Sequence, residues 1–197
     1  MSNLFQTIEQ EAFRAGITPR TRQSREWFRR KLQSMQSVNR RALMREGELS
    51  RTNKSAVGGM YMFFYDPKLK SKLPYWDNFP LVIAVQPAPG GFHGLNLHYL
   101  PLTLRAKFLD GLMDITNNNR WDESTKFGVS YQYMKKAAKM KYFKPCFKHY
   151  LTAHIEGDMA RVPAPEWEIA AFLPTAQWSK ADQSEVWADS RRTINGV

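Results

Sequence analysis

The stretch FPLVIAVQPAPGGFHGLNLHYL, residues 79–100, decides the fold class of this 197-residue chain. It begins with a run of apolar, mostly branched residues, turns at PAPGG, and returns as a second largely apolar run. Two β-type runs separated by a turn rich in proline and glycine are typical of an antiparallel hairpin. We therefore predict strands near residues 79–86 and 92–98.

Two further segments extend this sheet. MYMFFY (60–65) is a β-type run, and EWEIAAFLP (166–174) combines Trp, Ile and Phe between prolines, which favours a short strand over residues 166–173. Gly58, Gly59 and Gly94 suit sharp bends. The four segments together predict a small, bent, SH3-like β-barrel.

Helical periodicity surrounds the predicted barrel. Apolar residues recur at three-to-four spacing in residues 3–15, 24–35 and 101–114, whereas residues 36–59 are polar and lose that period. We expect further helices at 130–140 and 145–155, and a last helix over SKADQSEVWADSRR. The fold class is thus α+β, with a basic helical arm and linker at residues 1–57 and a core domain at 58–197.

Composition limits the compartment and the chemistry. The single cysteine, Cys146, cannot form an internal disulfide, and no apolar run reaches the roughly 20 residues that cross a bilayer. The N-terminus does not resemble a signal peptide. The sequence therefore predicts a protein that is intracellular or assembled in a reducing compartment, and we expect no membrane partner.

Positive charge is unevenly distributed along the chain. The net charge is +11, and residues 1–55 carry twelve Lys or Arg against five Asp or Glu. Residues 126–148 carry seven lysines and no carboxylate, while residues 56–125 are balanced, six against six. Two basic segments on an otherwise balanced chain indicate an anionic partner: nucleic acid, an acidic protein surface or a membrane face.

The second basic segment centres on YQYMKKAAKMKYFKPCFKHY, residues 131–150. An amphipathic helix with an aromatic core face and a solvated lysine face would account for much of this composition. A solvated face usually mixes both signs of charge, however, and a polyanion would relieve the repulsion between lysines. We predict contacts to nucleic acid or an acidic partner from Lys135, Lys136, Lys139, Lys141, Lys144 and Lys148.

The first basic segment, TPRTRQSREWFRRK, allows two interpretations. Arginine forks suit phosphates and acidic protein surfaces equally well, so Arg25, Arg29 and Arg30 are predicted to support the lysines. The same helix is amphipathic and carries Trp27, Phe28 and Leu32, so it could instead dock into a groove on a neighbouring subunit or pack on its own barrel.

Catalytic and cofactor-binding patterns are lacking. The histidine spacings do not suit a metal site, and GGFHG lacks the lysine and glycine spacing of a phosphate-binding loop. Cys146 with His149 is a conceivable nucleophilic pair, but a buried cysteine among aromatic residues fits the pattern better. We predict no enzymatic activity, no catalytic residues, no cofactor and no metal; Asn96 and His98 in GLNLHYLP are expected to be structural.

Long segments of the chain resemble a known family. MYMFFYDPKLKSKLPYWDNFPLVIAV, GGFHGLNLHYLPLTLRAKFLD, YFKPCFKHYL, EWEIAAFLP and VWADSRR are similar to virion proteins of T-even-like tailed bacteriophages and their cyanobacterial-virus relatives, which carry the label DNA end protector. The similarity covers roughly residues 58–192. The first 57 residues resemble the family only through REWFRRK.

The resemblance implies a virion protein assembled in the host cytoplasm as part of a larger particle. It would bind the ends of packaged double-stranded DNA near the portal, complete the head, and exclude exonuclease. Binding by charge would suffice, because contacts to the phosphate backbone do not depend on sequence. The alternative is a neck, tail or baseplate component whose N-terminal arm docks on other virion proteins.

Overall fold

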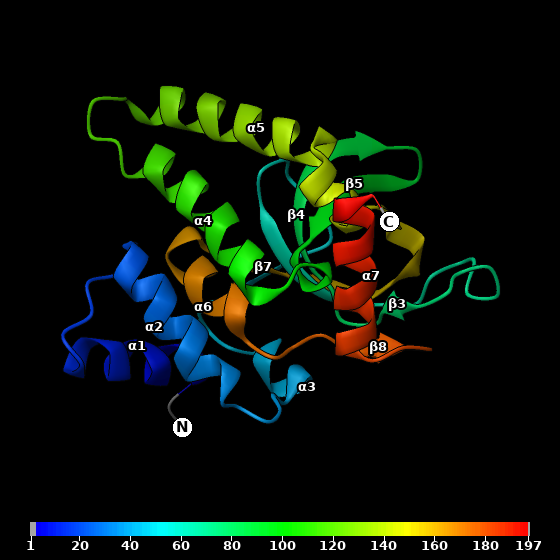
Figure 1. The fold of residues 1–197 in the computed structure, drawn as a ribbon, viewed down its shortest axis with the longest axis horizontal. Coiled ribbons are helices and arrows are strands. Elements are labelled where there is room, and N and C mark those ends of the chain that lie inside the picture. Colours follow the sequence, from blue (N-terminus) through cyan, green and yellow to red (C-terminus); the bar gives the residue numbers. More distant parts are fainter. Residues whose placement is uncertain (1–2, 197) are drawn as a thin grey trace.

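The computed structural model describes residues 3–196, which form an α+β fold (Figure 1). The α-helices are α1 (Leu4–Arg14), α2 (Arg22–Gln33), α3 (Arg40–Leu43), α4 (Leu102–Thr116), α5 (Glu123–Lys139), α6 (Trp167–Phe172) and α7 (Gln183–Asn195). The short 3₁₀ helices are η1 (Leu97–Tyr99), η2 (Lys141–Cys146), η3 (Thr152–His154) and η4 (Ala164–Glu166). The strands are β1 (Ser50–Thr52), β2 (Met60–Tyr65), β3 (Trp76–Asp77), β4 (Leu81–Ala88), β5 (Gly91–Asn96), β6 (Phe147–Leu151), β7 (Ile155–Val162) and β8 (Trp178–Ser179).

The predicted hairpin is confirmed as β4 and β5. The two strands are antiparallel, with Val82 opposite Asn96 and Ile83 opposite Leu95. Gly94 lies where the strands approach closely, because a Cβ there would come within 2.2 Å of the Val82 side chain. The hairpin forms the centre of a six-stranded antiparallel sheet with the order β1-β7-β2-β4-β5-β6.

The predicted SH3-like barrel is not confirmed. Within residues 3–196 no pairing joins the outer strands β1 and β6, so the sheet is open. One face of the sheet is nevertheless buried by side chains from its own strands, among them Tyr61, Phe63, Phe92 and Tyr150. Phe63 and Tyr150 pack edge to face at 5.3 Å. An aromatic cluster built only from strands requires the sheet to curve around it.

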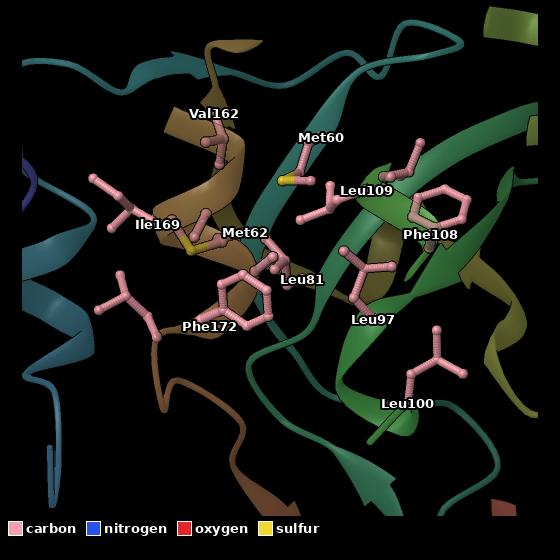
Figure 2. Packing of buried hydrophobic residues seen from close by; sticks show 14 of the residues in the cluster. Met60, Met62, Leu81, Leu97, Leu100, Phe108, Leu109, Val162, Ile169 and Phe172 are labelled. Atoms are coloured by element: carbon pink, nitrogen blue, oxygen red, sulfur yellow. The ribbon is translucent and has the colours of Figure 1, made fainter. Parts of the chain in front are cut away.

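The other face of the sheet carries the main core. Alternation along β2 sends Met60 and Met62 to this face, opposite to Tyr61 and Phe63. Figure 2 shows this packing, in which residues of β2, β4 and η1 meet α4 and α6. Phe108, Leu109, Ile169 and Phe172 supply the helical side, each no more than 2% exposed.

The N-terminal helices belong to the same core. Phe5 and Leu32 are fully buried, and Ile8 and Phe28 are each 4% exposed, all within the cluster that includes Met60 and Met62. α1 is held at its start by Glu46, whose carboxylate accepts the Leu4 amide at 2.9 Å. The division of the chain at residue 57 therefore stays a prediction about folding units, since both parts share one core.

The predicted strand at residues 166–173 is wrong, because this segment forms η4 and α6. Residues 168–173 are all buried, which a helix packed between α2 and α4 allows and a half-exposed strand does not. Two alanines add helix propensity that a prediction based on Trp, Ile and Phe undervalued.

The predicted helix at residues 145–155 is also wrong. Pro145 lies inside η2, and the following residues form β6, which pairs with β5 and places His149 opposite His93. The aromatic residues of FKHYL favour a strand once an unpaired neighbour is available. The predicted linker at residues 36–59 contains α3 and β1.

Candidate nucleic-acid interface

Helix α5 and the 3₁₀ turn η2 present most of the predicted lysines. Asp122 caps α5 by accepting the Thr125 amide at 2.7 Å, and burial of Met134 and Ala137 fixes which side of the helix faces the core. Tyr133 donates to the Phe108 carbonyl at 3.2 Å, so α5 is attached to α4. Figure 1 shows α5 along one edge of the molecule. In the chain, η2 follows α5 directly.

We define the basic ridge as five lysines on the outer side of α5 and on η2, namely Lys135, Lys136, Lys139, Lys141 and Lys144. Four of them are exposed, and Lys135 is half-buried with its ammonium 5.2 Å from the Tyr131 ring centre. Within the described part of the chain, no carboxylate forms an ion pair with any of the five. The ridge therefore carries positive charge that the fold itself does not neutralise.

Exposed apolar side chains lie among these lysines. Met140 is 48% exposed and Tyr142 is 52% exposed, between Lys139 and Lys144 in the sequence. An aromatic ring beside ammonium groups is a combination that proteins use to hold nucleic acids, because the ring stacks on bases while the cations contact phosphates.

Lys148 differs from the other predicted lysines. It lies in β6, where its ammonium is 4.2 Å from the ring centre of Tyr99. Burial lowers the pKa of Lys148 from its usual value. Its charge is directed to an aromatic neighbour within the fold, so it lies apart from the ridge.

The structure does not support Arg25 as a DNA contact. Arg25 is 3% exposed and forms ion pairs with Asp110 of α4 and Glu168 of α6. It also donates to the Met113 sulfur at 2.8 Å. A guanidinium enclosed by two carboxylates has no surface for a phosphate, so we correct this prediction: Arg25 attaches α2 to its own domain.

Arg29 and Arg30 share a carboxylate instead of joining the ridge. Glu26 lies 2.7 Å from Arg29 and 3.5 Å from Arg30. The hydrogen bond from Arg29 is the main cause of the lowered pKa of Glu26. The Arg30 side chain is still 71% exposed. The predicted continuous face of α2 arginines and lysines is therefore not present, because α2 is buried on one side and paired on the other.

The predicted docking face of α2 is also occupied within the chain. Phe28 and Leu32 are buried in the main core, and Trp27 packs against them, edge to face with Phe28 at 5.3 Å. Of the alternatives that the sequence left open, packing on its own domain is the one the structure shows. Phe28 and Leu32 are therefore not available to a neighbouring subunit, whereas Trp27 is only partly buried.

A buried polar network joins the sheet to the C-terminal segments. The Asp77 carboxylate accepts from His98 Nδ1 at 2.6 Å, and His98 Nε2 lies 3.1 Å from the Thr175 hydroxyl. Burial and the ensuing loss of solvation lower the pKa of His98, so we assign a neutral imidazole that donates to Asp77 and accepts from Thr175. Asp77 also accepts two backbone amides and the Asn96 amide.

This Asp–His–Thr arrangement is structural. His98 and Thr175 are 0% exposed, so no substrate reaches the imidazole. Burial raises the pKa of Asp77, but the hydrogen bonds that its carboxylate accepts, including the one from His98, outweigh that effect and lower the pKa. Every polar side-chain atom of the network has a partner, which matches the predicted structural role of Asn96 and His98.

Other candidate chemistry is limited in the same way. Cys146 is fully buried, and burial raises the pKa of its thiol, which opposes formation of a nucleophilic thiolate. Among the side chains that the structure describes, no group of three or more His, Cys, Asp or Glu could hold a metal ion. No helix within residues 3–196 is long and apolar enough to span a membrane.

Comparison with known proteins assigns the family. A family model described as "Phage T4 terminal DNA protecting protein" matches residues 1–190, which is nearly the whole chain. The chain belongs to this family, and the match includes the first 57 residues, where the sequence resemblance was weakest. No curated protein and no solved structure gave a match.

Proposed function

We propose, from membership in this family of phage DNA-end protecting proteins, that the chain binds the ends of packaged double-stranded DNA in the virion through the basic ridge. It acts without catalysis, beside the portal, where it completes the head. The observation that supports this proposal is the grouping of lysines on α5 and η2 with no carboxylate paired to them in the part of the chain that the structure describes.

Electrostatics explains why such a ridge suits duplex DNA. The duplex carries about one negative charge per 1.7 Å of axis, and each lysine that neutralises a phosphate releases a bound counterion. Contacts of this kind do not read the sequence, which suits a protein that must hold any DNA terminus.

Exposed Tyr142 supports binding at an end in particular. The flat face of a base pair is accessible only where the duplex stops, so a solvent-exposed ring can stack there and not along the duplex. We propose that the ridge holds the backbone while Tyr142 covers the terminal pair.

A salt series on a blunt linear duplex tests this function. The triple variant Lys135→Glu, Lys136→Glu, Lys139→Glu removes three phosphate contacts. The negative slope of log affinity against log salt should therefore become shallower by about 3 units. A gel shift measures the slope.

The matched control is Lys68→Glu, Lys70→Glu, Lys72→Glu, which makes the same change of charge in the loop between β2 and β3. We expect this control to retain the slope of the wild type within about one unit. Equal slopes in the ridge variant and the wild type would instead favour the alternative function, a neck, tail or baseplate component that contacts acidic virion proteins.

A further inference from the structure

A second basic feature lies on the opposite side of α5. A cleft of about 710 Å³ is bounded by α4, α5, β7 and the start of α6, together with the loop before α2. Ser130 of α5 lines the cleft, whereas Lys139 of the ridge is nine residues further on and, at about 100° per residue, points the other way. The cleft and the ridge are therefore separate surfaces.

The charged residues described in the cleft lining are all basic. Among the residues whose side chains the structure describes, its lining includes Arg20, Lys126 and Arg161 and no aspartate or glutamate. Arg161 lies in β7 as an exposed side chain without an ion pair to any residue in the described range. The guanidinium groups of Arg20 and Arg161 beside one concave surface raise the local concentration of anions.

Two polar groups in the lining lack hydrogen-bond partners among the residues that the structure describes. Ser130 is 8% exposed and its hydroxyl has no partner, and the buried Nε of Arg20 has none either. A buried donor left unpaired costs about 1–3 kcal/mol, so a fold retains such groups where something else engages them. A guanidinium N–H and a hydroxyl are both donors that a phosphate accepts.

Hydrogen bonds fix both the backbone and the side chain of Arg20 beside the cleft. Its φ of 61° is in the left-handed region, which is unfavourable for a residue with a side chain. Glu168 accepts its amide at 2.9 Å, and Asn117 donates to its carbonyl at 2.9 Å. Thr116 accepts from one terminal nitrogen of its guanidinium at 2.9 Å, so the Arg20 side chain is pre-oriented beside the cleft.

An indole completes the lining. Trp167 is half-buried, and its Nε1 donates to the Val162 carbonyl at 2.9 Å, which fixes the ring. A fixed aromatic ring at the edge of a basic cleft is a surface on which a base can stack. The cleft volume lies within the range of about 300–1,000 Å³ typical of small-molecule sites.

We propose that this cleft binds a nucleotide through a phosphate monoester, the group that ends a DNA strand. Arg20, Arg161 and the Ser130 hydroxyl contact the phosphate, and Trp167 stacks on the base. A terminal monoester carries close to two negative charges at neutral pH, whereas an internal diester carries one, so the cleft favours a strand end over the backbone. The choice of DNA as the source of the nucleotide rests on the proposed function.

Calorimetric titration with a single-stranded tetranucleotide tests the cleft directly. The 5′-phosphorylated form should bind the wild type about 10-fold or more tightly than the 5′-hydroxyl form, because charge-assisted hydrogen bonds are lost without the phosphate. The double variant Ser130→Ala, Arg161→Gln should lose this preference while folding normally, since it removes an unpaired hydroxyl and an exposed charge.

A ridge variant of equal charge loss, Lys136→Gln, separates this inference from the proposed function. It should retain the preference for the phosphorylated strand even if it weakens duplex binding. The proposal that the cleft binds a terminal phosphate would be overturned by either of two results. One is equal binding of the two tetranucleotides by the wild type, and the other is an unchanged preference in the double variant. Tighter binding of thymidine 5′-monophosphate than of the phosphorylated tetranucleotide would overturn its assignment to strand ends.

Discussion

Helix α2 and the basic ridge are the two lysine- and arginine-rich regions of this chain, and the fold uses them in opposite ways. Arg25 is buried between Asp110 and Glu168, and Arg29 and Arg30 share Glu26. Lys31 pairs with Glu11 of α1 at 2.6 Å. No lysine of the ridge has such a partner among residues 3–196.

The difference shows that local charge density does not by itself identify a binding surface. Both segments are basic in sequence, but the carboxylates that neutralise Arg25 lie 85 and 143 residues away. Cations that the fold pairs internally build structure, while cations it leaves unpaired are available to a partner. Substitutions of paired cations in α2 should therefore mainly change stability, and substitutions in the ridge should mainly change DNA affinity.

The largest effect is expected for Arg25→Ala. Removing one member of a buried ion-pair group leaves Glu168 charged and without its partner, which typically costs about 3–5 kcal/mol of the free energy of unfolding. Urea denaturation followed by tryptophan fluorescence measures the loss.

Arg30→Ala is the matched control on the same helix. Its side chain is 71% exposed, so we expect a change within about 0.5 kcal/mol. If both variants unfolded at the same urea concentration as the wild type, Arg25 would not attach α2 to α4 and α6 as described.

A smaller effect on stability is expected when a carboxylate is introduced beside the ridge lysines, as Glu26 lies beside the arginines of α2. Gln132 is exposed and lies four residues before Lys136 on α5, so Gln132→Glu places an acid in reach of that lysine. The pair should stabilise the helix by only about 0.2–0.5 kcal/mol. DNA affinity should nevertheless fall, and the salt slope should decrease by about 1 unit.

Gln132→Ala removes the same amide without adding charge and serves as the control for that variant. Filter binding of both variants over a salt series compares them. A Gln132→Glu slope equal to that of Gln132→Ala would show that Lys136 does not contact DNA phosphates.

Part of this structure could be predicted from the sequence because its signals are local. Branched residues on both sides of PAPGG defined β4 and β5, and three-to-four periodicity defined α1, α2 and α4. The exposure of Lys136, Lys139 and Lys144 followed from an amphipathic pattern.

The remainder depends on contacts between distant segments. For EWEIAAFLP and for the segment after Pro145, a short apolar run was compatible with either a helix or a strand. Packing against α2 makes the first segment a helix, and pairing with β5 makes the second a strand. The cleft residues Arg20, Ser130 and Arg161 have no common motif, because three separate segments bring them together. Only the absence of carboxylates near Ser130 gave any signal in the sequence.

Protection of DNA ends is the most direct test of a role for the unpaired ridge lysines. A blunt linear duplex is incubated with protein and then with an exonuclease that requires an end, and intact DNA is measured over time. The wild type and the Lys68→Glu, Lys70→Glu, Lys72→Glu variant should preserve the duplex, and the Lys135→Glu, Lys136→Glu, Lys139→Glu variant should not. Full protection by the folded ridge variant would contradict the assignment of DNA-end binding to α5 and η2.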